Sequence, residues 1–166
     1  MRASVHRVYT TRSCEETIAL GRELAKLLQP PKILILRGDL GSGKTTLVKG
    51  IAAALGAAEP DEVTSPTFTL IHEYAGRAID SSSPGENLGG TVLLYHLDLY
   101  RVENQRQLDT LGIEDLMTPQ SLILIEWGGK FPSVIAQSDG EIAIETPVGD
   151  ERRITLTIRP PDKLSL

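Results

Sequence analysis

Residues 38–45 of the chain, Gly-Asp-Leu-Gly-Ser-Gly-Lys-Thr, have the residue types and the spacing of a phosphate-binding loop. They fit the pattern G-x-x-x-x-G-K-[ST], whose glycines let the backbone curl so that successive N–H groups point at phosphate oxygens. Lys44 would bring its charge to the β- and γ-phosphates, and the Thr45 hydroxyl would be one ligand of a magnesium ion. An ordinary glycine-rich turn is the alternative. We therefore expect a site for ATP and Mg²⁺.

Glu126 is the best candidate for the carboxylate that such a site needs near its metal ion. It follows the apolar run Leu-Ile-Leu-Ile at residues 122–125, which predicts a buried strand. Because ligands collect at the carboxyl ends of the strands in open α/β sheets, Glu126 would lie at the same edge as the loop. The alternative is an ordinary acidic residue at the end of a strand.

A second polar set consists of His96, Asp98 and Tyr100, which alternate with leucines. A strand with this alternation would carry all three polar side chains on one face. From spacing alone, a functional surface and an exposed strand face are equally good interpretations. Thr67 belongs to the hydroxyl-rich segment at residues 64–67, which is either a loop that responds to the γ-phosphate or a turn before a strand.

The hydrophobic pattern predicts the elements that would position these residues. The apolar run at residues 32–37 predicts a strand buried on both faces directly before the glycine loop, and residues 46–55 predict a helix directly after it. Ser13 and Glu16 have the spacing of a capping box, which begins an earlier helix that Pro30 ends. That helix would bury Ile18, Leu24, Leu27 and Leu28. Further strands are predicted at residues 5–9, 66–74 and 92–100, an antiparallel pair at 141–146 and 152–158, and a helix at 105–116.

The chain, with 166 residues of which 40% are hydrophobic, has the size of one ordinary domain. We expect a single domain over residues 1–166, in which the serines and glycines of residues 75–91 mark a flexible insertion. The order of elements predicts an α/β protein with the three-layer fold of P-loop nucleotide hydrolases. Its central sheet would be mostly parallel, with antiparallel edge strands.

Charge and composition limit the classes of function. The net charge of -5 argues against an independent nucleic-acid binder, so contact with RNA would need a local patch or a partner protein. The only cysteine, Cys14, cannot form an internal disulfide or a cysteine-rich zinc site. No apolar run resembles a signal peptide or approaches the ~18 residues of a membrane span. We expect a cytoplasmic protein.

Five motifs, taken together and in this order, resemble the TsaE (YjeE) family. They are residues 38–46, Thr64-Ser-Pro-Thr-Phe68, His72-Glu-Tyr74, His96-Leu-Asp-Leu-Tyr-Arg101 and Leu124-Ile-Glu-Trp127. The resemblance runs from about residue 32 to residue 131. It implies the ATPase accessory subunit of bacterial threonylcarbamoyladenosine tRNA modification. Such a subunit works with TsaD and TsaB, which place threonylcarbamoyl on adenosine 37 of tRNAs that read ANN codons.

The resemblance also implies roles for single residues. Lys44 and Thr45 match the family's phosphate and magnesium residues, Glu126 matches a carboxylate beside the metal, and Asp98 is similar to the acidic residue needed for hydrolysis. Thr67 falls in a switch-like loop, and Trp127 is similar to a tryptophan beside the nucleotide, although a core tryptophan is the alternative. The full set of expected nucleotide-binding residues is Gly38, Asp39, Leu40, Gly41, Ser42, Gly43, Lys44, Thr45, Thr46, Thr67 and Trp127. The sequence departs from the family at Gly128, where proline is expected, and in the length of residues 75–91.

Other functions share parts of this pattern. A small-molecule kinase would need an acceptor pocket and a lid with arginines, and no clear lid segment is present. A regulatory module would hold the nucleotide without hydrolysing it, with the same loop. A GTPase would carry an Asn-Lys-x-Asp segment, which the sequence lacks. Arg101, Arg106 and Lys130 lie near the motifs; we interpret them as scattered surface charge, with contact to tRNA or TsaD as the alternative.

Overall fold

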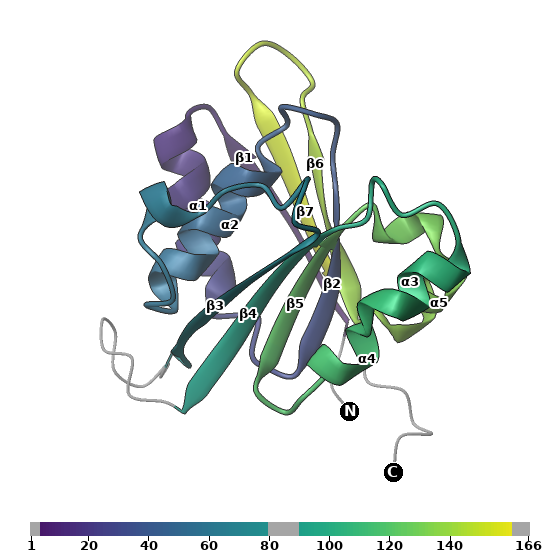
Figure 1. Ribbon diagram of the computed structural model, residues 1–166. Helices are drawn as coiled ribbons and strands as arrows, with labels where there is room; N and C mark the ends of the chain where they lie inside the picture. Colours follow the sequence, from purple (N-terminus) through teal and green to yellow (C-terminus); the bar gives the residue numbers. More distant parts are fainter. Residues whose placement is uncertain (1–3, 80–89, 161–166) are drawn as a thin grey trace.

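A mixed β-sheet lies between two layers of helices in the computed structural model, which describes residues 4–79 and 90–160 (Figure 1). The described part of the chain contains a seven-stranded sheet with the order β1-β7-β6-β2-β5-β4-β3. The strands are β1 Val5–Thr11, β2 Lys32–Arg37, β3 Ile71–Arg77, β4 Thr91–Asp98, β5 Ser121–Glu126, β6 Gly140–Glu145 and β7 Arg152–Ile158.

The centre of this sheet is parallel and its edges are antiparallel. Strand β2 lies between β5 and β6 and runs parallel to both, and β4 runs parallel to β5. At one edge β3 pairs antiparallel with β4, and at the other edge β7 pairs antiparallel with β6 and β1. The predicted α/β class, with a mostly parallel centre and antiparallel edge strands, is confirmed.

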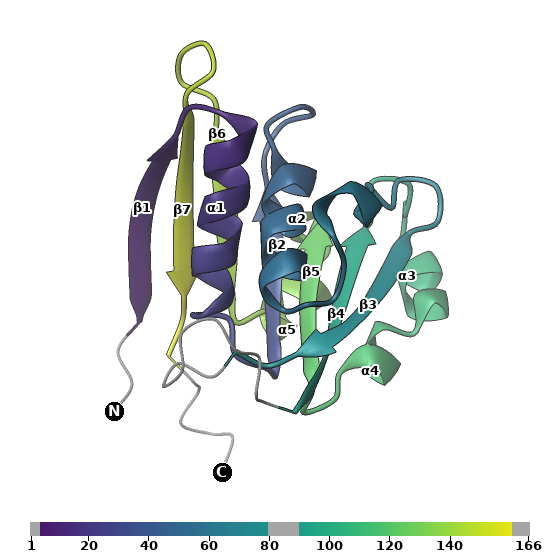
Figure 2. The ribbon, with the colours of Figure 1, turned by 90° about the vertical axis from the view of Figure 1, so that its left-hand side faces the viewer.

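Helices cover both faces of the sheet (Figures 1 and 2). Helices α1 (Cys14–Ala25) and α2 (Lys44–Ala54) pack on one face, and α3 (Gln105–Leu111), α4 (Ile113–Leu116) and α5 (Pro132–Gln137) lie on the other. Two 3-10 helices, η1 (Pro60–Glu62) and η2 (Gly128–Lys130), complete the helical segments of the described residues. The four central residues of β2, 33–36, are all apolar because alternate side chains enter two different hydrophobic cores, one under each helical layer.

Helices α1 and α2 touch through their backbones. A Cβ atom added to Gly50 of α2 would lie 2.0 Å from the carbonyl oxygen of Ile18, and one added to Gly21 of α1 would lie 2.4 Å from that of Leu47. Only glycine fits at both positions. This close approach fixes the position of α2 relative to α1. Because α2 begins with Lys44, the position of that residue is fixed as well.

The helix begun by Ser13 is present, and its cap differs in one detail from the predicted box. The Ser13 hydroxyl accepts a hydrogen bond from the Glu16 amide at 3.1 Å, as expected. The Glu16 carboxylate accepts from the amide of Arg12 rather than that of Ser13. Of the predicted buried face, Leu24 and Leu28 are buried, but Ile18 and Leu27 are only partly buried, because Thr17, Leu20 and Gly21 form the rest of the stripe that faces the sheet and α2.

Several predicted boundaries are wrong. Strand β1 continues to Thr11 and α2 begins at Lys44, so each is two residues longer at that end than predicted. The strand predicted from residue 66 begins only at Ile71, because the amide of Leu70 bonds to the carbonyl of Pro66 at 2.8 Å and closes a turn. The helix predicted over residues 105–116 is broken at Gly112, whose left-handed φ of 66° ends α3. The strand predicted to residue 100 ends at Asp98.

The predicted insertion at residues 75–91 falls largely outside the described residues, which leave out 80–89. Its first residues, 75–77, belong to β3, and Thr91 begins β4. Within the described ranges, no helix is both long and apolar enough to cross a membrane.

Replacing Gly50 with alanine tests the contact between α1 and α2. We expect Gly50→Ala to destabilise the protein by about 1–3 kcal/mol, because the added methyl group meets backbone that cannot move aside without shifting a helix. Thermal unfolding followed by circular dichroism measures the loss. Gly90→Ala is the matched control, since a Cβ at Gly90 meets nothing within 4 Å. An equal Tm for both variants would contradict the close packing of the two helices.

Candidate functional site

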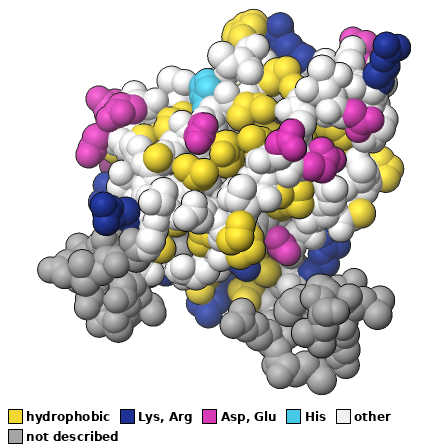
Figure 3. All heavy atoms as spheres, turned by 60° about the horizontal axis from the view of Figure 1, so that its bottom comes forward, with side chains coloured by type: hydrophobic (Ala, Val, Ile, Leu, Met, Phe, Trp, Pro, Cys, Tyr) yellow, Lys and Arg dark blue, Asp and Glu magenta, His cyan; other side chains and the backbone are white. Residues whose placement is uncertain are grey.

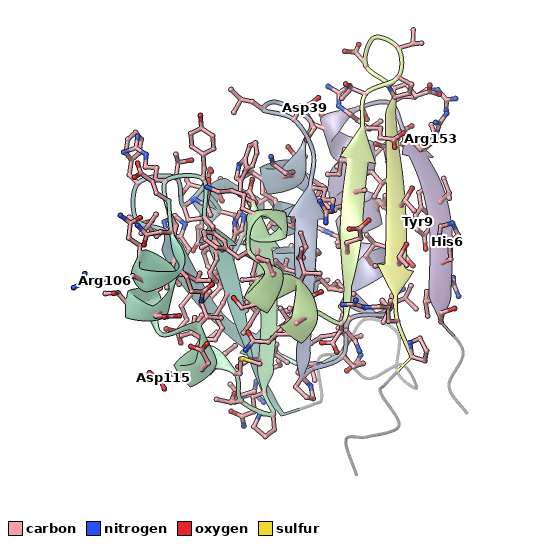
Figure 4. All side chains as sticks on the ribbon, turned by 90° about the vertical axis from the view of Figure 1, so that its right-hand side faces the viewer. His6, Tyr9, Asp39, Arg106, Asp115 and Arg153 are labelled. Atoms are coloured by element: carbon pink, nitrogen blue, oxygen red, sulfur yellow. The ribbon has the colours of Figure 1, made fainter. Side chains whose placement is uncertain are left out.

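The glycine loop joins β2 to α2 at the carboxyl end of the central parallel strands (Figure 1). Gly41 and Gly43 have left-handed φ angles of 79° and 106°. Nothing lies within 4 Å of a Cβ placed on either residue, so it is the backbone conformation and not a lack of space that favours glycine. Figure 4 shows Asp39 of this loop at one end of the sheet. The curl directs the loop and the N-terminal end of α2 toward the same cleft, as anion binding requires.

Lys44, the first residue of α2, is held at the inner wall of this cleft. Its Nζ atom donates a hydrogen bond to the carbonyl oxygen of Gly38 at 2.5 Å. The same atom lies 3.4 Å from Oε1 of Glu126 and 5.6 Å from the ring centroid of Trp127. The ammonium group is therefore fixed between the loop and the end of β5.

The register of β4 and β5 places the two candidate carboxylates beside one another. Asp98 and Glu126 are Cα partners in the parallel ladder, as are Leu36 and Glu126. Both carboxylates point to the face covered by α1 and α2, because they follow the alternation of the leucines that enter the core on that side. The two strand ends and the glycine loop thus converge at one point.

The polar residues of β4 do not form an exposed strand face. His96 and Asp98 have only 0% and 5% of their surface exposed, and Glu126, at the end of β5, has 4%. The predicted grouping of three side chains on one strand face is wrong for Tyr100, because β4 ends at Asp98 and Tyr100 lies in the following turn. Buried polar groups of this kind need partners, and each carboxylate has them.

Glu126 is bound on both of its oxygen atoms. Oε2 lies 2.7 Å from Nε2 of His96, and Oε1 faces the Lys44 ammonium. Burial by itself would raise the pKa of the Glu126 carboxyl, since a buried charge loses its hydration. The hydrogen bond and charge of His96, together with Lys44, outweigh this effect and lower the pKa below its usual value. Glu126 is therefore kept ionised in a buried place.

Asp98 is held by the backbone and by the loop before β3. Its Oδ1 accepts from the amide of Tyr100 at 2.9 Å, and its Oδ2 accepts from the Thr67 hydroxyl at 3.3 Å. The Thr67 hydroxyl in turn lies 2.9 Å from that of Ser65. The hydroxyl-rich segment thus leads into the turn before β3 and touches a candidate catalytic carboxylate, and its response to a γ-phosphate stays a prediction.

A cleft of about 650 Å³ brings most of the predicted site residues together. It is lined by Asp39, Leu40, Gly41, Ser42, Gly43, Lys44, Thr45, Thr46, Ser65, Thr67, Asp98, Tyr100, Glu126 and Trp127. Gly38 lines a neighbouring cavity of about 640 Å³, which shares Asp39, Lys44 and Trp127 with the cleft. Trp127 is not a core tryptophan, because its side chain is partly exposed and its ring lies 5.1 Å from that of Tyr100.

The expected set of site residues leaves out three residues of this site, although the sequence analysis considered the segments that contain them. Ser65 and Tyr100 line the cleft, and His96 is the buried partner of Glu126. The alternation of polar residues with leucines correctly places His96 on the same strand face as Asp98. Nothing in the sequence indicated that its partner would come from a strand thirty residues later in the chain.

The oxygen atoms of this cleft fit a magnesium ion that is bound together with phosphates. Thr45, Asp98 and Glu126 all line it and supply a hydroxyl and two carboxylates. Among residues 4–79 and 90–160, no group of three or more His, Cys, Asp or Glu side chains is arranged to hold a metal ion. Mg²⁺ usually takes one or two carboxylates plus substrate phosphates and waters, so this donor set suits it.

Comparison with known proteins gives a consistent result. The family model "Threonylcarbamoyl adenosine biosynthesis protein TsaE" matches residues 11–154. A protein of Bacillus subtilis named tRNA threonylcarbamoyladenosine biosynthesis protein TsaE is 37% identical over 143 residues, which are 86% of this chain and 80% of that protein. A protein of the same name from Treponema pallidum is 32% identical over 88% of this chain and 96% of its own length. The crystal structure of Bacillus subtilis YdiB superposes with a TM-score of 0.65 at 29% identity, and the match covers 96% of this chain and 90% of that one.

The charge of Glu126 can be tested through stability. We expect Glu126→Gln to lower the free energy of unfolding at neutral pH by on the order of 3 kcal/mol, because the buried Lys44 ammonium loses its anion and His96 loses a charged hydrogen-bond partner. Because folding lowers the pKa of Glu126, its contribution is present above the ordinary value of 4.5 and is lost as the pH falls through the folded value.

Urea denaturation of both proteins at neutral pH and well below pH 4.5 measures this dependence. Glu145→Gln is the control, since that carboxylate is exposed at the end of β6. A stability difference between Glu126→Gln and the parent that is equally large at both pH values would contradict the account.

Proposed function

The chain belongs to the TsaE family, whose members are tRNA threonylcarbamoyladenosine biosynthesis proteins, and on this basis we propose that it binds and hydrolyses ATP in support of that modification. Its partners would be TsaD and TsaB, and the modified base would be adenosine 37 of tRNAs that read ANN codons. The activity would take place in the cytoplasm. The observation that carries the proposal is the meeting of Lys44, Asp98 and Glu126 in one cleft beside the glycine loop.

ATP binding would rest mainly on the backbone of the glycine loop. The amides of residues 39–46 would surround the phosphates, and the N-terminal end of α2 would present its partial positive charge to them. Lys44 already lies at the inner wall, so a phosphate oxygen could replace the Gly38 carbonyl as its partner. Thr67 and Trp127 line the same cleft and would contact the nucleotide from its open side.

Magnesium, when bound with the nucleotide, would neutralise charge on the phosphate oxygens. Thr45 and Glu126 are the residues that would hold it. Glu126 suits this role because its partners keep it ionised. His96, bonded to Oε2, leaves Oε1 directed into the cleft beside Lys44.

Asp98 would orient the attacking water, while the loop amides and Lys44 stabilise negative charge on the transferred and leaving phosphates. Its two oxygens are already held by Tyr100 and Thr67, and a carboxylate fixed in this way is suited to placing a water molecule. No arginine lines the cleft among the described residues. Hydrolysis would therefore be slow until a partner completes the site.

The mouth of the cleft carries hydrophobic side chains that support docking of a protein partner. Leu40, Tyr100 and Trp127, which line the cleft, are 100%, 59% and 42% exposed, and Phe68, next to the lining residue Thr67, is 79% exposed. Exposed hydrophobic groups that gather at a site commonly mark an interaction surface. A partner seated here would contact the loop of Leu40 and the turn of Phe68 at the same time.

Contact with tRNA would be indirect, through the complex. On the coloured part of the face seen in Figure 3, charges of both signs are interspersed with hydrophobic side chains, with no basic footprint. Arg106 projects from α3 away from the loop that carries Asp39 (Figure 4). The net charge of -5 agrees with this arrangement.

Two substitutions separate binding from hydrolysis. We expect Lys44→Ala to abolish ATP binding and Asp98→Asn to retain it while lowering turnover by about a hundredfold or more. Isothermal titration calorimetry measures binding, and phosphate release in the presence of partners measures turnover. Asp61→Asn is the control, because that carboxylate is exposed on η1. Parental turnover by Asp98→Asn would contradict the role of Asp98, and parental ATP binding by Lys44→Ala would contradict the role of the loop.

The hydrophobic mouth can be tested without touching the residues that line the cleft. We expect Phe68→Ser to reduce the stimulation of hydrolysis by TsaD and TsaB by about tenfold, while the ATP dissociation constant stays within a factor of two. The matched control is Val8→Ser, an exposed hydrophobic residue of the edge strand β1. Equal stimulation of the Phe68→Ser variant and the control would remove Phe68 from the docking surface.

A further inference from the structure

Lys130 makes three hydrogen bonds that the proposed function does not use. Its Nζ atom donates to the carbonyl oxygens of Leu99 at 3.0 Å, Tyr100 at 3.0 Å and Val102 at 2.8 Å. An ammonium group has three N–H donors, so these acceptors use all of its capacity. Lys130 is therefore not a scattered surface charge with a head group free for tRNA.

The three carbonyls belong to one β-turn. The amide of Val102 bonds to the carbonyl of Leu99 at 3.0 Å and closes the turn over residues 99–102. Carbonyl dipoles that converge on one point repel one another, and the ammonium group of Lys130 offsets that repulsion. A lysine suits this place because its charge is compact, whereas the planar fork of an arginine could not meet three convergent oxygens.

This turn controls the groups that hold Asp98. The amide of Tyr100, within the turn, donates to Oδ1 of Asp98 at 2.9 Å. The guanidinium of Arg101 lies 4.3 Å from the ring centroid of Phe68, next to the Thr67 that donates to Oδ2. A displacement of the turn would thus change both donors to the carboxylate.

The turn is also joined to the segment that follows β5. The amide of Leu99 bonds to the carbonyl of Glu126 at 3.0 Å, and the ring of Tyr100 packs on Trp127. Lys130, in η2, adds the third link between these two segments. These three links connect the end of β4, which carries Asp98, with the end of β5, which carries Glu126.

We infer that Lys130 is a positioning residue that braces the turn at residues 99–102 and thereby fixes the Asp98 carboxylate for its reaction. The inference rests on the proposed hydrolysis of ATP for its effect on turnover. It predicts a loss of kcat with little change in ATP affinity, since Lys130 makes no bond to the glycine loop or to Lys44.

The substitution Lys130→Met tests this positioning role, because methionine keeps most of the side-chain volume and removes the three N–H donors. We expect kcat with TsaD, TsaB and tRNA to fall by about tenfold or more, with the ATP dissociation constant within a factor of two of the parent. The Tyr100 and Val102 amides should exchange hydrogen at least about tenfold faster. Lys26→Met, which removes an exposed ammonium from the end of α1, is the matched control and should match the parent in all three measurements.

A double-mutant cycle distinguishes positioning from a general structural effect. In the Asp98→Asn background, Lys130→Met should cost little further turnover, because its effect acts through Asp98. Fully additive losses, or parental kcat for Lys130→Met, would overturn the inference. If Lys130→Met does not fold, Lys130→Gln, with two donors, should show a smaller loss of kcat in the same cycle, and parental kcat would overturn the inference.

The amide exchange separates this inference from the proposed function. If the parent protein fails to hydrolyse ATP in every mixture, the proposed function fails, and faster exchange of the Tyr100 amide in Lys130→Met still supports the brace. Unchanged exchange in a folded variant would overturn the brace whatever the turnover.

Discussion

The buried charge of Glu126 is the constraint on which the rest of the site depends. An ionised carboxylate with so little exposure is tolerated only with cationic and hydrogen-bonding partners around it. Lys44 and His96 supply these partners from α2 and β4. Because each comes from a different element, the pairing requires the glycine loop, β4 and β5 to end at the same place. The sheet order, with β5 between β2 and β4, meets this requirement.

The same order would link the proposed hydrolysis to the state of the surrounding turns. Asp98 is held by a turn on each side, one carrying Thr67 and one carrying Tyr100. Both turns present aromatic side chains at the surface of the molecule. A partner that binds this surface would act on the donors of Asp98 directly, without a change in the sheet. The Glu126 carboxylate would stay fixed while the position of the Asp98 carboxylate changes.

Much of the fold follows from the sequence because its signals are local. The short apolar runs of β2 and β5 are typical of buried parallel strands. The glycine loop between a strand and a helix indicates at which end of the sheet the site lies. The predicted boundaries of two elements were wrong because a residue with a positive φ angle, Leu70 or Gly112, interrupts the chain there. The pairing of His96 with Glu126 and the three bonds of Lys130 join segments far apart in the chain. Such pairings depend on sheet register and on a turn that composition does not encode.

The most direct test of the account is phosphate release from Mg-ATP by the purified chain, alone and then with TsaB, TsaD and tRNA. We expect slow release by the chain alone and a marked increase when all partners are present, because the cleft would be completed by the surface that covers its mouth. Background release in every mixture, with ATP still bound, would contradict the account. The cleft would then belong to a protein that holds the nucleotide without hydrolysing it.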